Sequence, residues 1–97
     1  MTPITRELLK DNGYSRQEPY FNEDVIEYAD KSGRIIFAEC SNMVGREWTI
    51  HVDNEDMESI GSLDVQYVEQ ANALLDLLDM QEFKLKVPNN QKEYYGG

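Results

Sequence analysis

The chain has 97 residues, of which 40% are apolar, and its nineteen acids and nine bases give a formal net charge of −10. This length predicts one domain with a small core, and one tryptophan, six tyrosines and three phenylalanines argue against a disordered acidic chain. The acidic excess disfavours direct binding to nucleic acids or anionic membranes, and no apolar run approaches the ~20 residues that span a bilayer.

The first predicted element is a helix over Thr2–Asp11. Thr2 would be its N-cap, Pro3 suits the first helical position, and Asn12-Gly13 is a typical stop signal. The next segment, Tyr14–Asn22, mixes polar residues with a proline. It is predicted to be a loop or an irregular edge strand.

A β-hairpin and a further strand follow. Two segments rich in β-branched and aromatic residues, Asp24–Ala29 and Arg34–Cys40, are separated by Asp30-Lys31-Ser32-Gly33, which is typical of a turn. Glu47–Asp53 then alternates apolar and polar residues. This alternation predicts a half-buried strand whose inner face carries Trp48, Ile50 and Val52.

The last third of the chain predicts a long helix. A polar loop over Asn54–Ser62 precedes a helix over Leu63–Met80, whose apolar residues recur every three or four positions. Ser62 or Asp64 would cap this helix. Phe83, Leu85 and Val87 alternate with two lysines and predict a final strand, which Pro88 ends.

The predicted order is therefore α-β-β-β-α-β. It indicates a single α+β domain over residues 1–88, with a mostly antiparallel sheet of about four strands and two helices packed on it. Residues 89–97 are expected to form a flexible polar tail. The strand at Glu47–Asp53, the long helix and the final strand could form a right-handed crossover unit with parallel strands.

The net charge lies in one interval of the chain. Between Arg46 and Lys84 there is no lysine or arginine, yet this interval carries ten acids, and the remainder of the chain is neutral. We expect these acids to form a surface that steers a basic partner, although acids that only maintain solubility remain an alternative. The residues predicted to bind the partner are Asp53, Glu55, Asp56, Glu58, Asp64, Glu69, Asp76 and Asp79.

Metal and catalytic chemistry are not favoured by the pattern. Counted from Asp53, the acidic loop lacks the ligands and the glycine of a calcium loop at two positions. His51 is the only histidine and Cys40 the only cysteine, without recognisable zinc-ligand spacing. A small enzyme would need the fold to join His51 to Cys40 or to a carboxylate pair. We therefore predict no metal, no cofactor and no catalytic residue.

The compartment is predicted from what the chain does not contain. Its first residues lack an apolar signal region, and a lone cysteine is compatible with reducing conditions. We expect a cytoplasmic protein that does not interact with a membrane. Its oligomeric state is left open by the sequence.

Three blocks of sequence resemble a set of small bacterial proteins without an assigned activity. The blocks are Ile4–Tyr14, Trp48–Asn54 and Val65–Leu75, which together cover about half of the chain. Proteins of that set often accompany phage or mobile-element genes. The resemblance implies a similar genomic setting and supplies no mechanism.

The function expected from the sequence is that of a non-enzymatic accessory or interaction protein. It would present its acidic loop and helix to a basic protein surface. One alternative is a nucleic-acid mimic that inhibits a DNA-binding or defence protein, which requires an ordered row of carboxylates spaced like backbone phosphates. Another is a homo-oligomeric structural subunit, which requires an exposed apolar patch.

Overall fold

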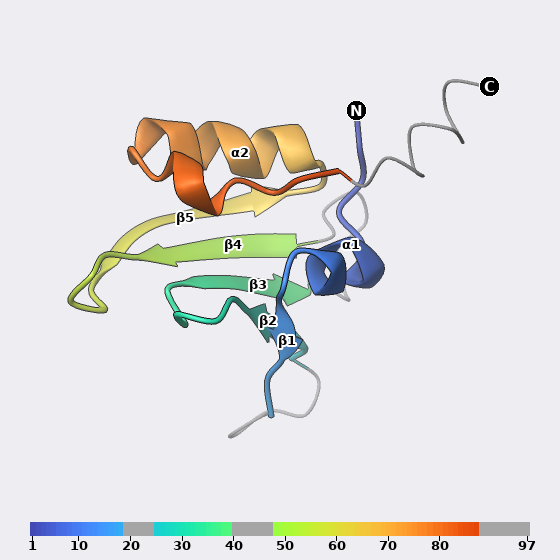
Figure 1. Cartoon of the computed structure of the whole chain (residues 1–97), viewed down its shortest axis with the longest axis horizontal. Helices are drawn as coiled ribbons and strands as arrows, with labels where there is room; N and C mark the ends of the chain where they lie inside the picture. The colour runs from blue at the N-terminus through green and yellow to red at the C-terminus, as the bar shows by residue number, and fades with distance from the viewer. Residues whose placement is uncertain (19–24, 40–47, 88–97) are drawn as a thin grey trace.

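The computed structural model describes residues 1–18, 25–39 and 48–87 of the chain (Figure 1). It is an α+β domain built on a five-stranded antiparallel sheet with two α-helices, so the predicted class is confirmed and the sheet has one strand more than expected. The elements are α1 (Arg6–Asp11), β1 (Ser15–Arg16), β2 (Glu27–Ala29), β3 (Ile35–Glu39), β4 (Trp48–Asp53), β5 (Ser59–Val65), α2 (Val68–Leu77) and the 3₁₀ helix η1 (Gln81–Phe83).

The strands form a meander in which each strand pairs with the next along the chain. The predicted hairpin is confirmed as β2 and β3, whose turn contains Gly33 at φ 77°. Asp30 closes this turn, because its carboxylate accepts hydrogen bonds from the Ile35 N–H at 3.0 Å and the Ser32 hydroxyl at 2.7 Å. Every pairing in the described sheet is antiparallel, so the predicted parallel crossover unit is wrong.

Helix α1 begins later than predicted. Thr5 is its N-cap, with the side-chain oxygen accepting the Leu8 N–H at 3.1 Å, and not Thr2. Residues 2–4 are held instead by the segment between β5 and α2, since the Ile4 N–H donates to the Gln66 carbonyl and the Val68 N–H donates to the Thr2 carbonyl. The predicted stop is confirmed, with Gly13 at φ 85°.

The core lies between one face of the sheet and the helices. Cross-strand register places Ile35 opposite Val52 and Phe37 opposite Ile50, and all four side chains are fully buried. The predicted inner face of β4 is therefore confirmed. Both helices pack on this same face, because Leu8 and Leu9 of α1 and the buried residues of α2 belong to the same apolar cluster.

The segment predicted to be a loop and the start of a helix is instead β5. Residues 54–58 form a short turn, in which the Asn54 side-chain oxygen accepts the N–H groups of Asp56 and Glu58. Helix α2 then begins only at Val68, after the N-cap Tyr67, so neither Ser62 nor Asp64 caps it. The Gln70 side chain accepts the N–H groups of Gln66 and Tyr67 at 2.7 and 3.0 Å. The bond from the Tyr67 N–H is the part of a capping box in which the side chain at the third helical position accepts the N-cap N–H.

The predicted final strand does not join the sheet. Leu85 is buried and Phe83 and Val87 are half-buried, as the alternation predicts, but residues 81–83 form η1 and residues 84–87 are extended without a strand partner. This extended segment lies over the core between α1 and α2 (Figure 1). The side chains of Asn12 and Asn72 hold the backbone of this segment.

Several sequence predictions fall wholly or partly outside the described residues. These are residues 19–22 of the predicted loop or edge strand, the first residue of the predicted hairpin, Cys40, Glu47, the stop at Pro88 and the polar tail over residues 89–97. Among the residues that are described, no helix is long and apolar enough to cross a membrane.

Candidate functional site

The fold separates the eight predicted partner-binding acids into two groups. Asp53, Glu55, Asp56 and Glu58 lie at or in the turn between β4 and β5, and Asp76 and Asp79 lie where α2 ends. Figure 1 shows this turn and the end of α2 at the same end of the molecule. Asp64 near the end of β5 and Glu69 at the start of α2 lie toward the opposite end. The acids therefore do not form one continuous row.

Several of these carboxylates already have intramolecular roles. Asp64 accepts the Thr49 hydroxyl at 2.7 Å, and Asp76 pairs with the Lys84 ammonium group at 3.0 Å. Glu69 accepts the backbone N–H of Thr2 at 2.9 Å, and this hydrogen bond holds the pKa of Glu69 below its usual value of 4.5. These acids stabilise local structure, so their charge is not all available to a partner.

The acids at the turn are the more accessible group. Within residues 1–18, 25–39 and 48–87, no group donates a hydrogen bond to, or forms an ion pair with, the carboxylates of Asp53, Glu55, Asp56 and Asp79. Met57, in the same turn, has a positive φ of 63° and a half-exposed side chain. This turn is therefore an exposed negative surface, with one nearby cation, the Arg34 guanidinium, which donates to the Asp53 carbonyl at 3.3 Å.

Next to this acidic turn, β5 forms an edge of the sheet. Hydrogen-bonded pairs alternate along antiparallel strands, and the Asp53 N–H donates to the Arg34 carbonyl at 2.8 Å. On β4, the backbone N–H and C=O groups of residues 49, 51 and 53 therefore point toward β3, and those of residues 48, 50 and 52 point toward β5. Their partners on β5 are Gly61, Leu63 and Val65. It follows that Ser62 directs its N–H and C=O away from β4.

The outer side of Ser62 is open within the described part of the chain. No backbone hydrogen bond from another described segment reaches Ser59–Val65 on that side, and pairing resumes only beyond the strand, where Pro3 bridges Tyr67. Two apolar side chains of this strand remain accessible: Ile60 is 40% exposed and Leu63 is 44% exposed. On α2, which packs against β5, Leu77 is 83% exposed. An open strand with apolar flanks is a template for another strand.

Sequence reasoning did not find this edge, because it assigned Asn54–Ser62 to a loop. The alternation of apolar and polar residues that would predict β5 is weak, because β5 has a bulge where its register with β4 shifts at Val52 and Asp53. A bulge changes the phase of the alternation, and Gly61 adds a residue that is more typical of turns. The exposed side chains of an edge strand also give no clean apolar pattern.

The residues considered for enzyme chemistry are only partly placed. His51 is exposed on the sheet face opposite the helices, where its cross-strand neighbours are Ile36 and Ser62. Cys40 lies outside the described residues, so its distance from His51 is not defined. Among the described residues, no three histidine, cysteine or acidic side chains are grouped as metal ligands would be.

Comparison with known proteins supplies no family. No protein-family model, no curated protein and no solved structure matches the chain.

Proposed function

We propose that this protein is a non-enzymatic interaction module that binds an extended, basic segment of another protein along β5. The partner segment would become a sixth strand, with backbone hydrogen bonds to the outward N–H and C=O of Ser62. The single observation that carries the proposal is the open outer side of this edge, on which Ile60 and Leu63 are exposed.

The charge of the module selects the partner. The acids of the β4–β5 turn stand at the start of β5, and from residue 47 to residue 83 the chain has no lysine or arginine. A basic segment would gain attraction along this edge, whereas acidic segments would be repelled. A second copy of the chain would bring its own net charge of −10, which disfavours self-pairing at the same edge.

Side chains of the partner strand would supply specificity. Successive residues of an added strand point to opposite faces, so alternate residues would reach the helix-bearing face. There they would meet Leu63, which lies opposite the buried Ile50 and is 44% exposed. We infer a partner segment in which apolar residues alternate with lysine or arginine.

The nucleic-acid mimic is less well supported by this geometry. A mimic needs carboxylates at a spacing near that of duplex phosphates, one charge per ~1.7 Å of axis. The eight acids are instead divided between two ends of the molecule, and Asp64, Glu69 and Asp76 are engaged with protein groups.

The proposal is tested with a short fluorescent peptide of alternating lysine and valine, titrated with the protein at low and high salt. We compare Ser62→Pro, which removes the outward N–H while keeping the bonds to β4, with Ser62→Ala, which retains that N–H. We expect Ser62→Ala to bind like the wild type and Ser62→Pro to bind about five- to tenfold more weakly. Thermal unfolding of both variants checks the fold.

Charge is tested separately with the triple variant Glu55→Gln, Asp56→Asn and Glu58→Gln. We expect it to weaken binding of the basic peptide at low salt and to have little effect at high salt. A peptide of alternating glutamate and valine is the matched ligand control. The proposal is rejected if both peptides bind equally, or if Ser62→Pro binds as tightly as Ser62→Ala. Light scattering at the same concentrations measures the mass of the protein in solution. A dimer would mean that a second copy of the chain, and not a basic partner, pairs with β5.

A further inference from the structure

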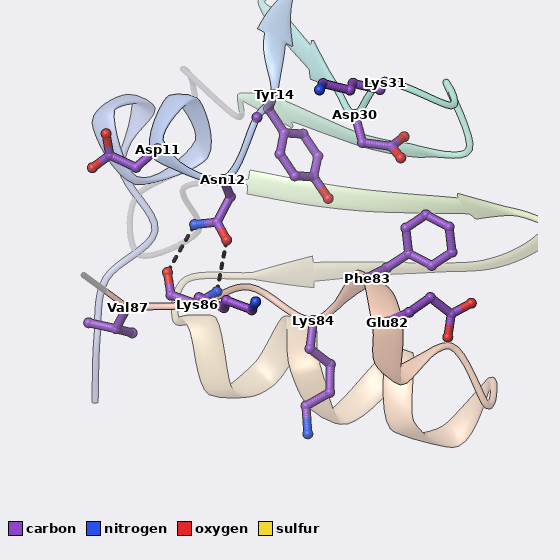
Figure 2. A pocket seen from close by; sticks show the side chains of 11 residues that line it. Asp11, Asn12, Tyr14, Asp30, Lys31, Glu82, Phe83, Lys84, Lys86 and Val87 are labelled. Carbon is purple, nitrogen blue, oxygen red and sulfur yellow. Dashed lines mark hydrogen bonds between the residues drawn. The ribbon is translucent and has the colours of Figure 1, made fainter. Parts of the chain in front are cut away.

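A cavity of about 880 Å³ opens on the helix-bearing side of the molecule, away from the β5 edge (Figure 2). Its wall is formed by three segments that are far apart in the sequence: the end of α1, the turn between β2 and β3, and residues 82–87. The proposed partner strand uses none of these segments. The cavity is therefore a second candidate site that the sequence analysis did not predict.

The cavity wall is held in place by specific contacts. Asn12 donates its side-chain N–H to the Lys86 carbonyl and accepts the Lys86 N–H, at 2.9 and 2.8 Å, and both bonds are drawn in Figure 2. The Arg34 guanidinium lies over the ring of Phe83, 5.0 Å from its centroid. These contacts fix the backbone of Lys86 and one face of the Phe83 ring, so the wall is formed before any ligand arrives.

Tyr14 projects into this cavity. Its side chain is only 6% exposed, and its ring packs edge-on against Phe37 with centroids 5.4 Å apart. Figure 2 shows its hydroxyl pointing into the space between the lining residues. Within the described chain, no protein group forms a hydrogen bond with this hydroxyl. No described side-chain oxygen is both fully buried and without a hydrogen-bond partner, so the Tyr14 hydroxyl is reached from the cavity and is available to a ligand.

The protonation state of Tyr14 favours a donor role. Burial raises the pKa of Tyr14 above its usual value, and the nearby negative charge of Asp30 raises it further. The phenol therefore keeps its proton at neutral pH. A ligand would meet a neutral O–H that can donate to an acceptor atom.

The lysines of the wall supply further donors. Lys31 and Lys86 line the cavity, and neither has an ion-pair partner within the described residues, whereas Lys84 pairs with Asp76. Of the acids in the wall, Asp30 is already engaged by Ser32 and by the Ile35 N–H. The acids without such bonds are Asp11 and Glu82. The wall therefore carries as many free acids as free lysines, and the Tyr14 phenol adds a neutral donor. It favours a ligand whose acceptor group reaches Lys31, Lys86 and the Tyr14 O–H while staying clear of Asp11 and Glu82.

We infer that this cavity binds a small planar organic anion of the aromatic carboxylate class. The aromatic body would lie against Phe83, the carboxylate would be attracted by Lys31 and Lys86, and the Tyr14 hydroxyl would donate a hydrogen bond to an acceptor on the ligand. This assignment is independent of the proposed strand-binding function, since it involves a different part of the molecule.

The test is a titration of the ¹⁵N-labelled protein with benzoate, followed by NMR. We expect saturable shifts of the amide signals of Gly13, Lys31 and Phe83, with the signals of β5 unchanged. Tyr14→Phe removes only the hydroxyl and keeps the ring against Phe37, so it should bind benzoate about three- to tenfold more weakly. Lys10→Gln, which changes an exposed lysine of α1 outside the cavity wall, is the control and should bind like the wild type.

Two further ligands decide the chemical class. Benzylamine has the same ring with a positive charge, and acetate has the carboxylate without the ring. We expect neither to reach the affinity of benzoate. The inference is overturned if benzoate causes no saturable shifts, if benzylamine binds more tightly, or if Tyr14→Phe and the wild type bind equally. The dispersion of the amide signals shows whether Tyr14→Phe is folded. Lys86→Gln provides a second variant, which should weaken benzoate binding without changing the fold.

Discussion

The side chain of Asn72 on α2 forms two hydrogen bonds with the backbone of Leu85. Its amide nitrogen donates to the Leu85 carbonyl at 3.0 Å, and its amide oxygen accepts the Leu85 N–H at 2.8 Å. Asn12 makes the same pair of bonds with Lys86, the next residue along the chain. Two asparagines therefore satisfy the backbone groups that a neighbouring strand would otherwise satisfy. This arrangement positions the segment that forms one wall of the cavity.

The first prediction concerns Asn72→Ala. This change removes both bonds and leaves the part-buried N–H and C=O of Leu85 without protein partners, so we expect a loss of about 1–3 kcal/mol in the free energy of unfolding. Asn72→Asp keeps an acceptor for the N–H but loses the donor, and should be intermediate. Urea denaturation measures all three proteins. An Asn72→Ala variant as stable as the wild type would contradict the assigned role.

The second prediction concerns the coupling between Asn12 and Asn72. Asn12 and Asn72 each hold one of two consecutive residues by a pair of hydrogen bonds, and we call each pair a clamp. Loss of one clamp should loosen the segment that the other clamp binds. The double alanine variant is therefore expected to lose less stability than the sum of the two single losses, by about 0.5 kcal/mol or more. The measurement is a double-mutant cycle in urea. Strict additivity would mean that the two clamps act independently.

These clamps also explain which parts of the fold the sequence could and could not predict. The alternation of Phe83, Leu85 and Val87 correctly predicts which side chains are buried, because alternation reports side-chain environment. It does not report whether the backbone partner is a strand or an asparagine. For this reason a correct burial pattern led to an incorrect strand.

The central sheet was predictable for the opposite reason. Trp48, Ile50 and Val52 are buried on one face while Thr49 and His51 are not, so periodicity and structure agree along β4. The open edge of β5 was not predictable, because its bulge and its exposed side chains remove the pattern on which such a prediction relies. The acids of the turn are neighbours in the sequence, but their separation from Asp64 and Glu69 depends on the direction of β5 and α2.

The third prediction concerns the close approach of α2 to Gly61. A Cβ atom at this position would lie 3.0 Å from Leu78 Cδ1 and 3.7 Å from Leu74 Cδ1. Gly61→Val adds two methyl groups beyond that Cβ, so we expect it to displace α2 and to cost about 1–3 kcal/mol. Ser62→Val places the same side chain on the opposite, exposed face of β5 and should change stability by less than about 0.5 kcal/mol. Thermal and urea unfolding compare the two variants, and equal stabilities would contradict the packing described here.

The fourth prediction concerns the pH dependence contributed by Glu69. Its pKa is lowered in the folded protein by the hydrogen bond from the Thr2 N–H, so the folded state binds this proton less readily than the unfolded state does. The stabilisation is therefore present above the usual glutamate pKa and is lost as the pH falls through the lowered value. Because Glu69 is exposed, Glu69→Gln should cost only about 0.3–1 kcal/mol at neutral pH.

This pH dependence is measured by urea unfolding of the wild type and Glu69→Gln from neutral pH into the acid range. The difference between the two proteins should shrink toward zero as the pH falls. Thr2→Pro removes the donating N–H but keeps the Thr2 carbonyl that accepts the Val68 N–H, so in that background Glu69→Gln should cost less at neutral pH. A constant difference at every pH, or an equal cost in both backgrounds, would show that the charge of Glu69 acts through something other than Thr2.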